Sequence, residues 1–77
     1  MDISLLQTLG ANVQAARIAA GISKVDLCLA ADISRPLLDW IEDGRGNIRV
    51  DTLEDLADAL GTSPEELLRP HRANNSR

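Results

Sequence analysis

The 77-residue sequence is poor in aromatic residues and in cysteine. Trp40 is its only tryptophan, and it has no phenylalanine or tyrosine, so aliphatic side chains must fill the core. Cys28 is the only cysteine, which excludes an internal disulfide, and its place on an apolar helical face favours a small buried hydrophobe. The chain also lacks an apolar run of about 18 residues and a basic-then-apolar leader. We therefore expect a soluble, cytoplasmic protein without membrane contact.

The groups that catalysis and metal binding require are scarce as well. His71 is the only histidine, and no second histidine or cysteine stands at the spacing of metal ligands. No glycine-rich loop follows a strand pattern, so no phosphate cradle is indicated. Glu65 and Glu66 suit the first turn of a helix better than the roles of general acid and base. The sequence therefore predicts no enzyme activity, no metal site and no cofactor.

Leucine, isoleucine, valine and alanine recur at helical spacing, and no run alternates as a strand would. This pattern predicts an all-α domain over residues 1–69, followed by a disordered tail over residues 70–77. Helices are expected from about Ser4 to Ala20, twice between Ser23 and Asp43, from a cap at Asp51 or Thr52 to Leu60, and briefly after Ser63. The expected core residues on the first and fourth of these five helices are Leu5, Leu6, Leu9, Val13, Ala16, Leu53, Leu56, Ala57 and Leu60.

The range Ser23–Gly44 contains two short helical patterns joined by one tight break. Ser23 and Ser34 are suited to cap the two helices, since a serine hydroxyl accepts from a backbone amide of the first turn. Asp32 is expected to turn the chain, because aspartate tolerates a left-handed conformation. Pro36 fits the first turn of the second helix, where its missing N–H has no intrahelical partner. This spacing suits a helix laid into the major groove of DNA.

The helix after the break, about Ser34–Asp43, is expected to bury its apolar face. Its outer residues are Arg35, Pro36, Asp39 and Trp40. A recognition helix presents side chains to base edges from such a surface. Arg35 is the first candidate for base contact, because a guanidinium matches the O6/N7 edge of guanine. The alternative is a solvated ion pair between Arg35 and Asp39, four residues further on, and both interpretations can hold together.

The order of these features resembles the lambda-repressor-like helix-turn-helix domains of the XRE/Cro-C1 family. The resemblance covers about residues 9–68. It is carried by Leu9-Gly10, Arg17, Gly21-Ile22-Ser23, Leu27, Ile33-Ser34, Ile41-Glu42, Gly44, Thr52-Leu53, Leu56-Ala57, Ala59-Leu60-Gly61 and Leu67. It implies a five-helix DNA-binding domain in which the helix before the turn steadies the protein on the DNA backbone. The next helix reads the groove, and such domains usually act as dimers on two-fold sites.

The resemblance also implies roles for particular residues. Arg17 and Glu42 are expected to form a partly buried ion pair that fixes the angle of the recognition helix. Lys24 stands where the family often has a glutamine that touches a phosphate, and a lysine can still meet a phosphate as a point charge. In the glycine-flanked loop after the recognition helix, Arg45 and Asn47 are placed to touch the DNA backbone. The basic residues expected around this one face are Arg17, Lys24, Arg35, Arg45 and Arg49.

The formal net charge of −4 disfavours non-specific attraction to DNA. The excess of acidic residues is largest after Val50, where the sequence has six acidic residues and three arginines. We therefore expect modest, salt-sensitive affinity per domain and a need for a dimer. More apolar residues occur than one small bundle obviously buries, and some are expected to face a second subunit: Ile3, Leu5, Leu6, Leu67 and Leu68. Two recognition helices would then lie about 34 Å apart.

A second interpretation belongs to another functional class. Pro36, Leu37 and Trp40 replace polar residues that are usual on a reading surface, although Pro36 or Leu37 can contact a thymine methyl and the Trp40 indole a phosphate. Leu37 and Trp40, together with Leu29, can instead form an apolar patch for a protein partner. On that interpretation the chain is a protein-interaction module, antitoxin-like or regulator-binding, with weak or no DNA binding.

Overall fold

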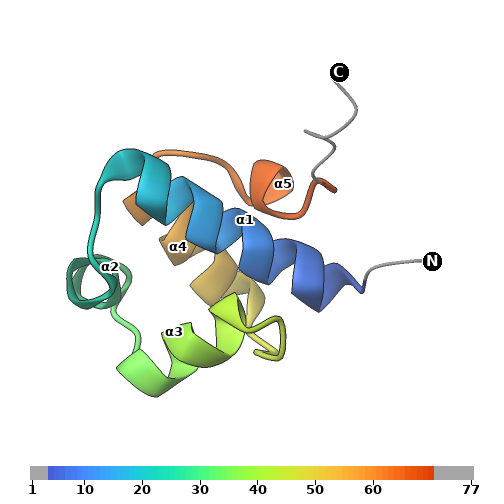
Figure 1. The fold of residues 1–77 in the computed structure, drawn as a ribbon, viewed down its shortest axis with the longest axis horizontal. Coiled ribbons are helices and arrows are strands. Elements are labelled where there is room, and N and C mark those ends of the chain that lie inside the picture. The colour runs from blue at the N-terminus through green and yellow to red at the C-terminus, as the bar shows by residue number, and fades with distance from the viewer. Residues whose placement is uncertain (1–3, 71–77) are drawn as a thin grey trace.

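The computed structural model describes residues 4–70, which form five helices and no strand (Figure 1). They are α1 (Leu5–Ala20), α2 (Lys24–Ala31), α3 (Arg35–Glu42), α4 (Val50–Leu60) and α5 (Pro64–Leu67). Helix α1 packs against α3, α4 and α5, while α2 packs against α3 and α4. In Figure 1, α3 and α5 lie on opposite sides of α1. The predicted all-α, five-helix fold is confirmed.

Several sequence predictions concern residues outside the described range of 4–70. They are the disordered tail beyond Pro70, in which His71 was expected to lie, and the subunit contact of Ile3. Within the described range, no helix is long and apolar enough to cross a membrane. The same residues contain no group of three or more His, Cys, Asp or Glu side chains arranged to hold a metal ion.

Serine hydroxyls begin four of the helices. In each case the hydroxyl accepts from the backbone amide three residues on, over 3.0 to 3.2 Å, and the serines are Ser4, Ser23, Ser34 and Ser63. Helix α4 differs, because it begins at Val50 after an extended Arg49 that supplies no side-chain cap. The predicted cap at Asp51 or Thr52 therefore lies two or three residues too far along the chain. Asp51 lies inside the first turn, where its negative charge favours the helix N-terminus.

The buried core draws on every helix and consists of Leu9, Val13, Leu27, Ala31, Leu38, Ile41, Leu53, Leu56, Ala57 and Leu67. Leu5 was expected in this core but is 59% exposed, since it lies in the first turn of α1 at the margin of the bundle. Leu67 is only 2% exposed, so its expected contact with a second subunit is wrong. Cys28 is partly buried against the core, and this burial raises the pKa of its thiol.

Helix α5 is tied to α1 by the side chain of Asn12. Its Nδ2 donates to the backbone oxygen of Arg69 at 2.7 Å and to that of Leu67 at 2.9 Å. Leu67 is the last residue of α5 and Arg69 follows it, and neither carbonyl has an intrahelical donor. Asn12 therefore supplies the donor that closes the C-terminal end of this short helix.

Replacing Asn12 with alanine is expected to lower the free energy of unfolding by about 1–3 kcal/mol, because carbonyls beside the core lose their donor. Urea denaturation followed by circular dichroism measures this loss. Gln14→Ala is the matched control, since Gln14 is an exposed amide on the same helix. Equal stability of the two variants would show that α5 is held by its apolar contacts alone.

Candidate nucleic-acid interface

Helix α3 presents a polar stripe to solvent because its apolar residues lie on one side. Leu38 and Ile41 are buried to within 1% exposure. Arg35 and Pro36 are exposed at the N-terminal end of α3, and Trp40 is 59% exposed one turn later. The structure therefore places the sequence-predicted reading residues on the outer surface, with Asp39 partly covered by its neighbours.

A tight turn sets the direction of α3 relative to α2. Asp32 has φ 57° and ψ 49°, the left-handed conformation predicted from the sequence, and its amide donates to the oxygen of Cys28. The amide of Ile33 also donates to the Cys28 oxygen, at 3.0 Å. Ser34 is extended and then caps α3. The chain thus turns within three residues, so that α3 begins close to the C-terminus of α2, while Lys24 at the N-terminus of α2 reaches Asp39 on the second turn of α3.

The loop after α3 folds back onto the helix. The amides of Arg45 and Gly46 both donate to the backbone oxygen of Trp40, at 2.9 and 3.0 Å. Gly46 is buried, and a Cβ at this position would lie 2.8 Å from the Ile41 side chain and 2.9 Å from its nitrogen. Only a residue without a side chain fits there. The exposed Arg45 and Asn47 are consequently held close to the end of α3.

Arg17 and Glu42 form a two-pronged ion pair between α1 and α3. Arg17 Nε donates to Glu42 Oε2 at 2.7 Å, and Arg17 Nη2 donates to Oε1 at 3.2 Å. Glu42 is 3% exposed and Arg17 is 13% exposed, and their hydrogen bond raises the pKa of Arg17. Arg17 also donates to the oxygen of Ile22 at 3.2 Å. This arginine is turned inward, so it leaves the basic face on which it was also expected.

Asp39 is the centre of a second set of ion pairs. Its Oδ1 accepts from Lys24 Nζ at 3.0 Å and from Arg35 Nε at 3.3 Å. These bonds lower the pKa of the Asp39 carboxyl, chiefly through the contact with Lys24. Lys24 Nζ also lies 3.9 Å from Glu42 Oε1. A chain of alternating charges therefore runs from Arg17 to Arg35 and joins α1, α2 and α3.

Only one of the two ion pairs of Asp39 was predicted from the sequence. The spacing of four residues on one helix predicted the contact between Arg35 and Asp39. The contact of Lys24 with Asp39 was missed, because the two residues are 15 positions apart on different helices. The position of Lys24 at the start of α2 predicts its contact with Asp39 only when the direction of α3 is also known.

The six lysine and arginine side chains between residues 4 and 70 all have acidic partners. Arg45 pairs with Asp43 at 3.4 Å, and Arg49 pairs with Asp51 at 3.1 Å, at the two ends of the loop between α3 and α4. Exposed pairs of this kind contribute little to stability and are screened by salt. A phosphate can therefore replace the acid at a small cost.

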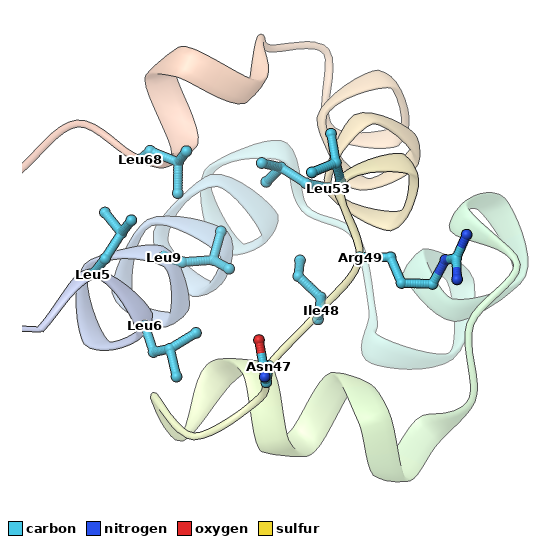
Figure 2. Close-up of a pocket in the computed structure, with 9 residues that line it drawn as sticks. Leu5, Leu6, Leu9, Asn47, Ile48, Arg49, Leu53 and Leu68 are labelled. Carbon is cyan, nitrogen blue, oxygen red and sulfur yellow. The ribbon is translucent and has the colours of Figure 1, made fainter.

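An apolar groove of about 210 Å³ opens between α1, α5 and the start of α4 (Figure 2). It is lined by Leu5, Leu6, Leu9, Asn47, Ile48, Arg49, Val50, Leu53 and Leu68. In Figure 2, Leu5, Leu6 and Leu68 face Ile48 and Leu53 across the opening. Val50 is 74% exposed. Three of the leucines expected to exceed the needs of the bundle thus gather at one surface.

The helices, the left-handed turn and the outward stripe of α3 define a helix-turn-helix domain, the fold of DNA-binding regulators. The family described as a helix-turn-helix domain matches residues 8–69 of the sequence. The chain belongs to this family. The resemblance to XRE/Cro-C1 regulators that the sequence indicated is confirmed.

Solved structures of several regulators are similar to this chain. The restriction-modification controller protein C.AhdI from Aeromonas hydrophila is 29% identical, with a TM-score of 0.76, over 80% of this chain and 94% of its own. The hypothetical transcription factor NHTF from Neisseria is 28% identical, with a TM-score of 0.84, over 92% and 82%. The clp gene regulator ClgR from Corynebacterium glutamicum is 28% identical, with a TM-score of 0.83, over 88% and 72%. A comparison with curated proteins finds no match.

Proposed function

We propose that this protein is a sequence-specific transcriptional regulator of the cytoplasm that binds double-stranded DNA as a dimer, with α3 in the major groove. The observation that carries the proposal is the exposed stripe of α3, with Arg35 beside Lys24 of the preceding helix. The family and the similar regulators support the same function. The proposed base-reading residues are Arg35, Pro36, Asp39 and Trp40, and those on the DNA backbone are Lys24, Arg45 and Asn47.

Arg35 carries the strongest proposed base contact. Its bond to Asp39 uses Nε, while the two terminal nitrogens of a guanidinium can donate to O6 and N7 of guanine. Lys24 meets a phosphate at the edge of the groove. Arg45 and Asn47 meet phosphates beyond the end of α3, because the loop is hydrogen-bonded to Trp40.

The apolar groove is the proposed site of the subunit contact. Leu5 and Val50 are 59% and 74% exposed at the groove, and Leu6 and Leu68 also line it. Clustered exposed apolar side chains mark protein interfaces. A contact on this surface leaves Lys24, Arg35 and Arg45 outside it, since none of them lines the groove. Asn47 does line the groove, so its proposed phosphate contact requires that the second subunit leave its amide exposed. Two copies of α3 about 34 Å apart can then enter successive major grooves.

Selection of bound sequences from random duplexes tests the proposal. We expect the native protein to enrich one two-fold sequence. Arg35→Ala is expected to bind the selected duplex about 5- to 150-fold more weakly and to lose preference at one base pair, the usual worth of a two-pronged arginine contact. Titration of a labelled duplex measures both effects.

Arg69→Ala is the matched control, because Arg69 is an exposed arginine in an ion pair with Glu66 on α5. It is expected to retain the native sequence preference. Enrichment of no sequence by the native protein, or an unchanged preference in Arg35→Ala, contradicts the proposed reading role.

The alternative function, a protein-interaction module, draws on exposed apolar residues of α2 and α3. Trp40, Val25 and Leu29 are 59%, 57% and 76% exposed. Leu37, which was also expected in this patch, is partly buried against the core and adds less to it. On this alternative, Trp40→Ala abolishes a protein complex, and the native protein binds no duplex even in low salt.

A further inference from the structure

We propose that Asp39 is a specificity-determining residue that holds Lys24 and Arg35 in ion pairs and thereby weakens binding to DNA of arbitrary sequence. Binding to the cognate site is less affected. This inference rests on the proposed function of α3 as a recognition helix. In this role, which is additional to the base contact proposed for it above, Asp39 acts through the two basic residues and is a positioning residue for both of them.

The geometry places one carboxylate oxygen between cations from two helices. Oδ1 of Asp39 accepts from Lys24 Nζ of α2 at 3.0 Å and from Arg35 Nε of α3 at 3.3 Å. A phosphate that approaches either cation therefore meets the negative charge of Asp39 beside it. The three side chains are 31% to 51% exposed, so water and DNA reach the pairs and can open them.

Asp39 disfavours non-specific complexes in particular. Binding to arbitrary sequences depends on phosphates neutralised by basic side chains. In such a complex Lys24 and Arg35 can donate their remaining N–H groups to phosphates, but the Asp39 carboxylate beside them repels those phosphates and offsets part of the attraction. Asp39 thus makes Lys24 and Arg35 weaker general phosphate ligands than they would be without it.

The cognate complex does not require the same loss. A guanidinium has five N–H donors in a fixed plane, and its two terminal nitrogens suffice for guanine. Arg35 can therefore read a base while Nε stays on Asp39. The bond from Lys24 restrains the Asp39 carboxylate from the other side. The ion pair with Asp39 weakens the attraction of Arg35 for phosphates, and it also directs the terminal nitrogens of Arg35 toward a base.

The test compares Asp39→Asn with the native protein on two probes, the duplex obtained by selection and a duplex of mixed sequence. We expect Asp39→Asn to bind the mixed-sequence duplex about three- to tenfold more tightly. Its plot of log K against log salt is expected to steepen by about 1–2, the change for one or two added phosphate contacts. Affinity for the selected duplex is expected to stay equal or to fall, so the ratio of the two affinities decreases.

Two further variants separate this role from simpler ones. Asp58→Asn on α4 removes the same charge, and residues 4–70 offer Asp58 no ion pair. It is expected to shift both affinities alike and to keep their ratio. Asp39→Glu retains the charge and is expected to restore a native salt slope. Thermal melting establishes that each variant is folded.

The outcomes distinguish the inference from the function on which it rests. If the native protein selects a sequence but Asp39→Asn keeps the native ratio and salt slope, the inference fails and the function stands. The same holds if Asp58→Asn reproduces the change in the ratio. If neither the native protein nor Asp39→Asn binds any duplex at low salt, both the function and the inference fail.

Discussion

Replacing Gly10 with alanine is expected to lower the free energy of unfolding by about 3 kcal/mol or more, the upper range for overpacking. A Cβ at Gly10 would overlap the backbone oxygen of Ile41 and would lie 3.0 Å from the nitrogen of Gly44. Both are backbone atoms, so no side chain can rotate away. Helix α1 and the end of α3 must separate before the methyl group fits.

Helix propensity by itself predicts the opposite result, namely that Gly10→Ala stabilises the protein. Alanine in the middle of an exposed helix stabilises it by about 1 kcal/mol relative to glycine. Urea denaturation therefore shows which effect dominates at Gly10, the helix propensity of alanine or the overlap of its methyl group with α3. Gly21→Ala is the control, because its φ of 70° costs about 1–2 kcal/mol while its Cβ meets nothing. A native-like Gly10→Ala would contradict the close packing of these helices.

Breaking the ion pair between Arg17 and Glu42 is expected to cost about 3–5 kcal/mol of stability, as for other buried pairs. Arg17→Ala leaves the Glu42 carboxylate, only 3% exposed, without its two-pronged donor. Lys24 is the remaining cation, 3.9 Å away and already bonded to Asp39. The loss of stability therefore reflects mainly the cost of leaving the Glu42 charge buried without a partner. The strength of the ion pair itself contributes less to it.

A double variant, Arg17→Met with Glu42→Leu, separates these two contributions. We expect it to be more stable than either single variant, since no unpaired charge remains in the core. Urea denaturation of the four proteins gives the coupling energy. Arg69→Ala, which breaks an exposed pair with Glu66, is the control and is expected to lose no more than about 1 kcal/mol. A similarly small loss in Arg17→Ala would show that the pair does not anchor α3.

These two contacts have a common consequence for function. Gly10 and the ion pair both join α1 to the C-terminal half of α3. They hold the recognition helix at one distance and one angle relative to the rest of the bundle. Variants that remain folded but loosen either contact are therefore also expected to weaken selective DNA binding.

Many elements of the fold could be predicted from short stretches of sequence. The serine caps and the left-handed Asp32 depend on atoms within four residues of each other, so a local pattern is sufficient. The start of α4 was misplaced, because Arg49 is extended but offers no capping oxygen, and the better capping residues follow it. Helix starts without a cap leave no local signal.

The side-chain environment was less predictable than the helices. Helical periodicity placed Leu5 inward, but a residue in a first turn is buried only if another element extends over it. Leu67 was expected at a subunit contact and instead fills the core. Both errors have one cause, since periodicity gives the apolar face of a helix but not how far its neighbours extend.

The amino-acid sequence by itself determines the order of the helices, the serine caps, the left-handed turn at Asp32 and the outward stripe of α3. Each of these features depends on residues one or two turns apart. Three features arise only when the helices pack. They are the ion pairs of Lys24 and Arg35 with one carboxylate, the inward orientation of Arg17 and the apolar groove. These features depend on side chains far apart in the chain, whose distances are set by the angles between helices. Tertiary packing therefore decided which cations remain at the surface and which acids restrain them.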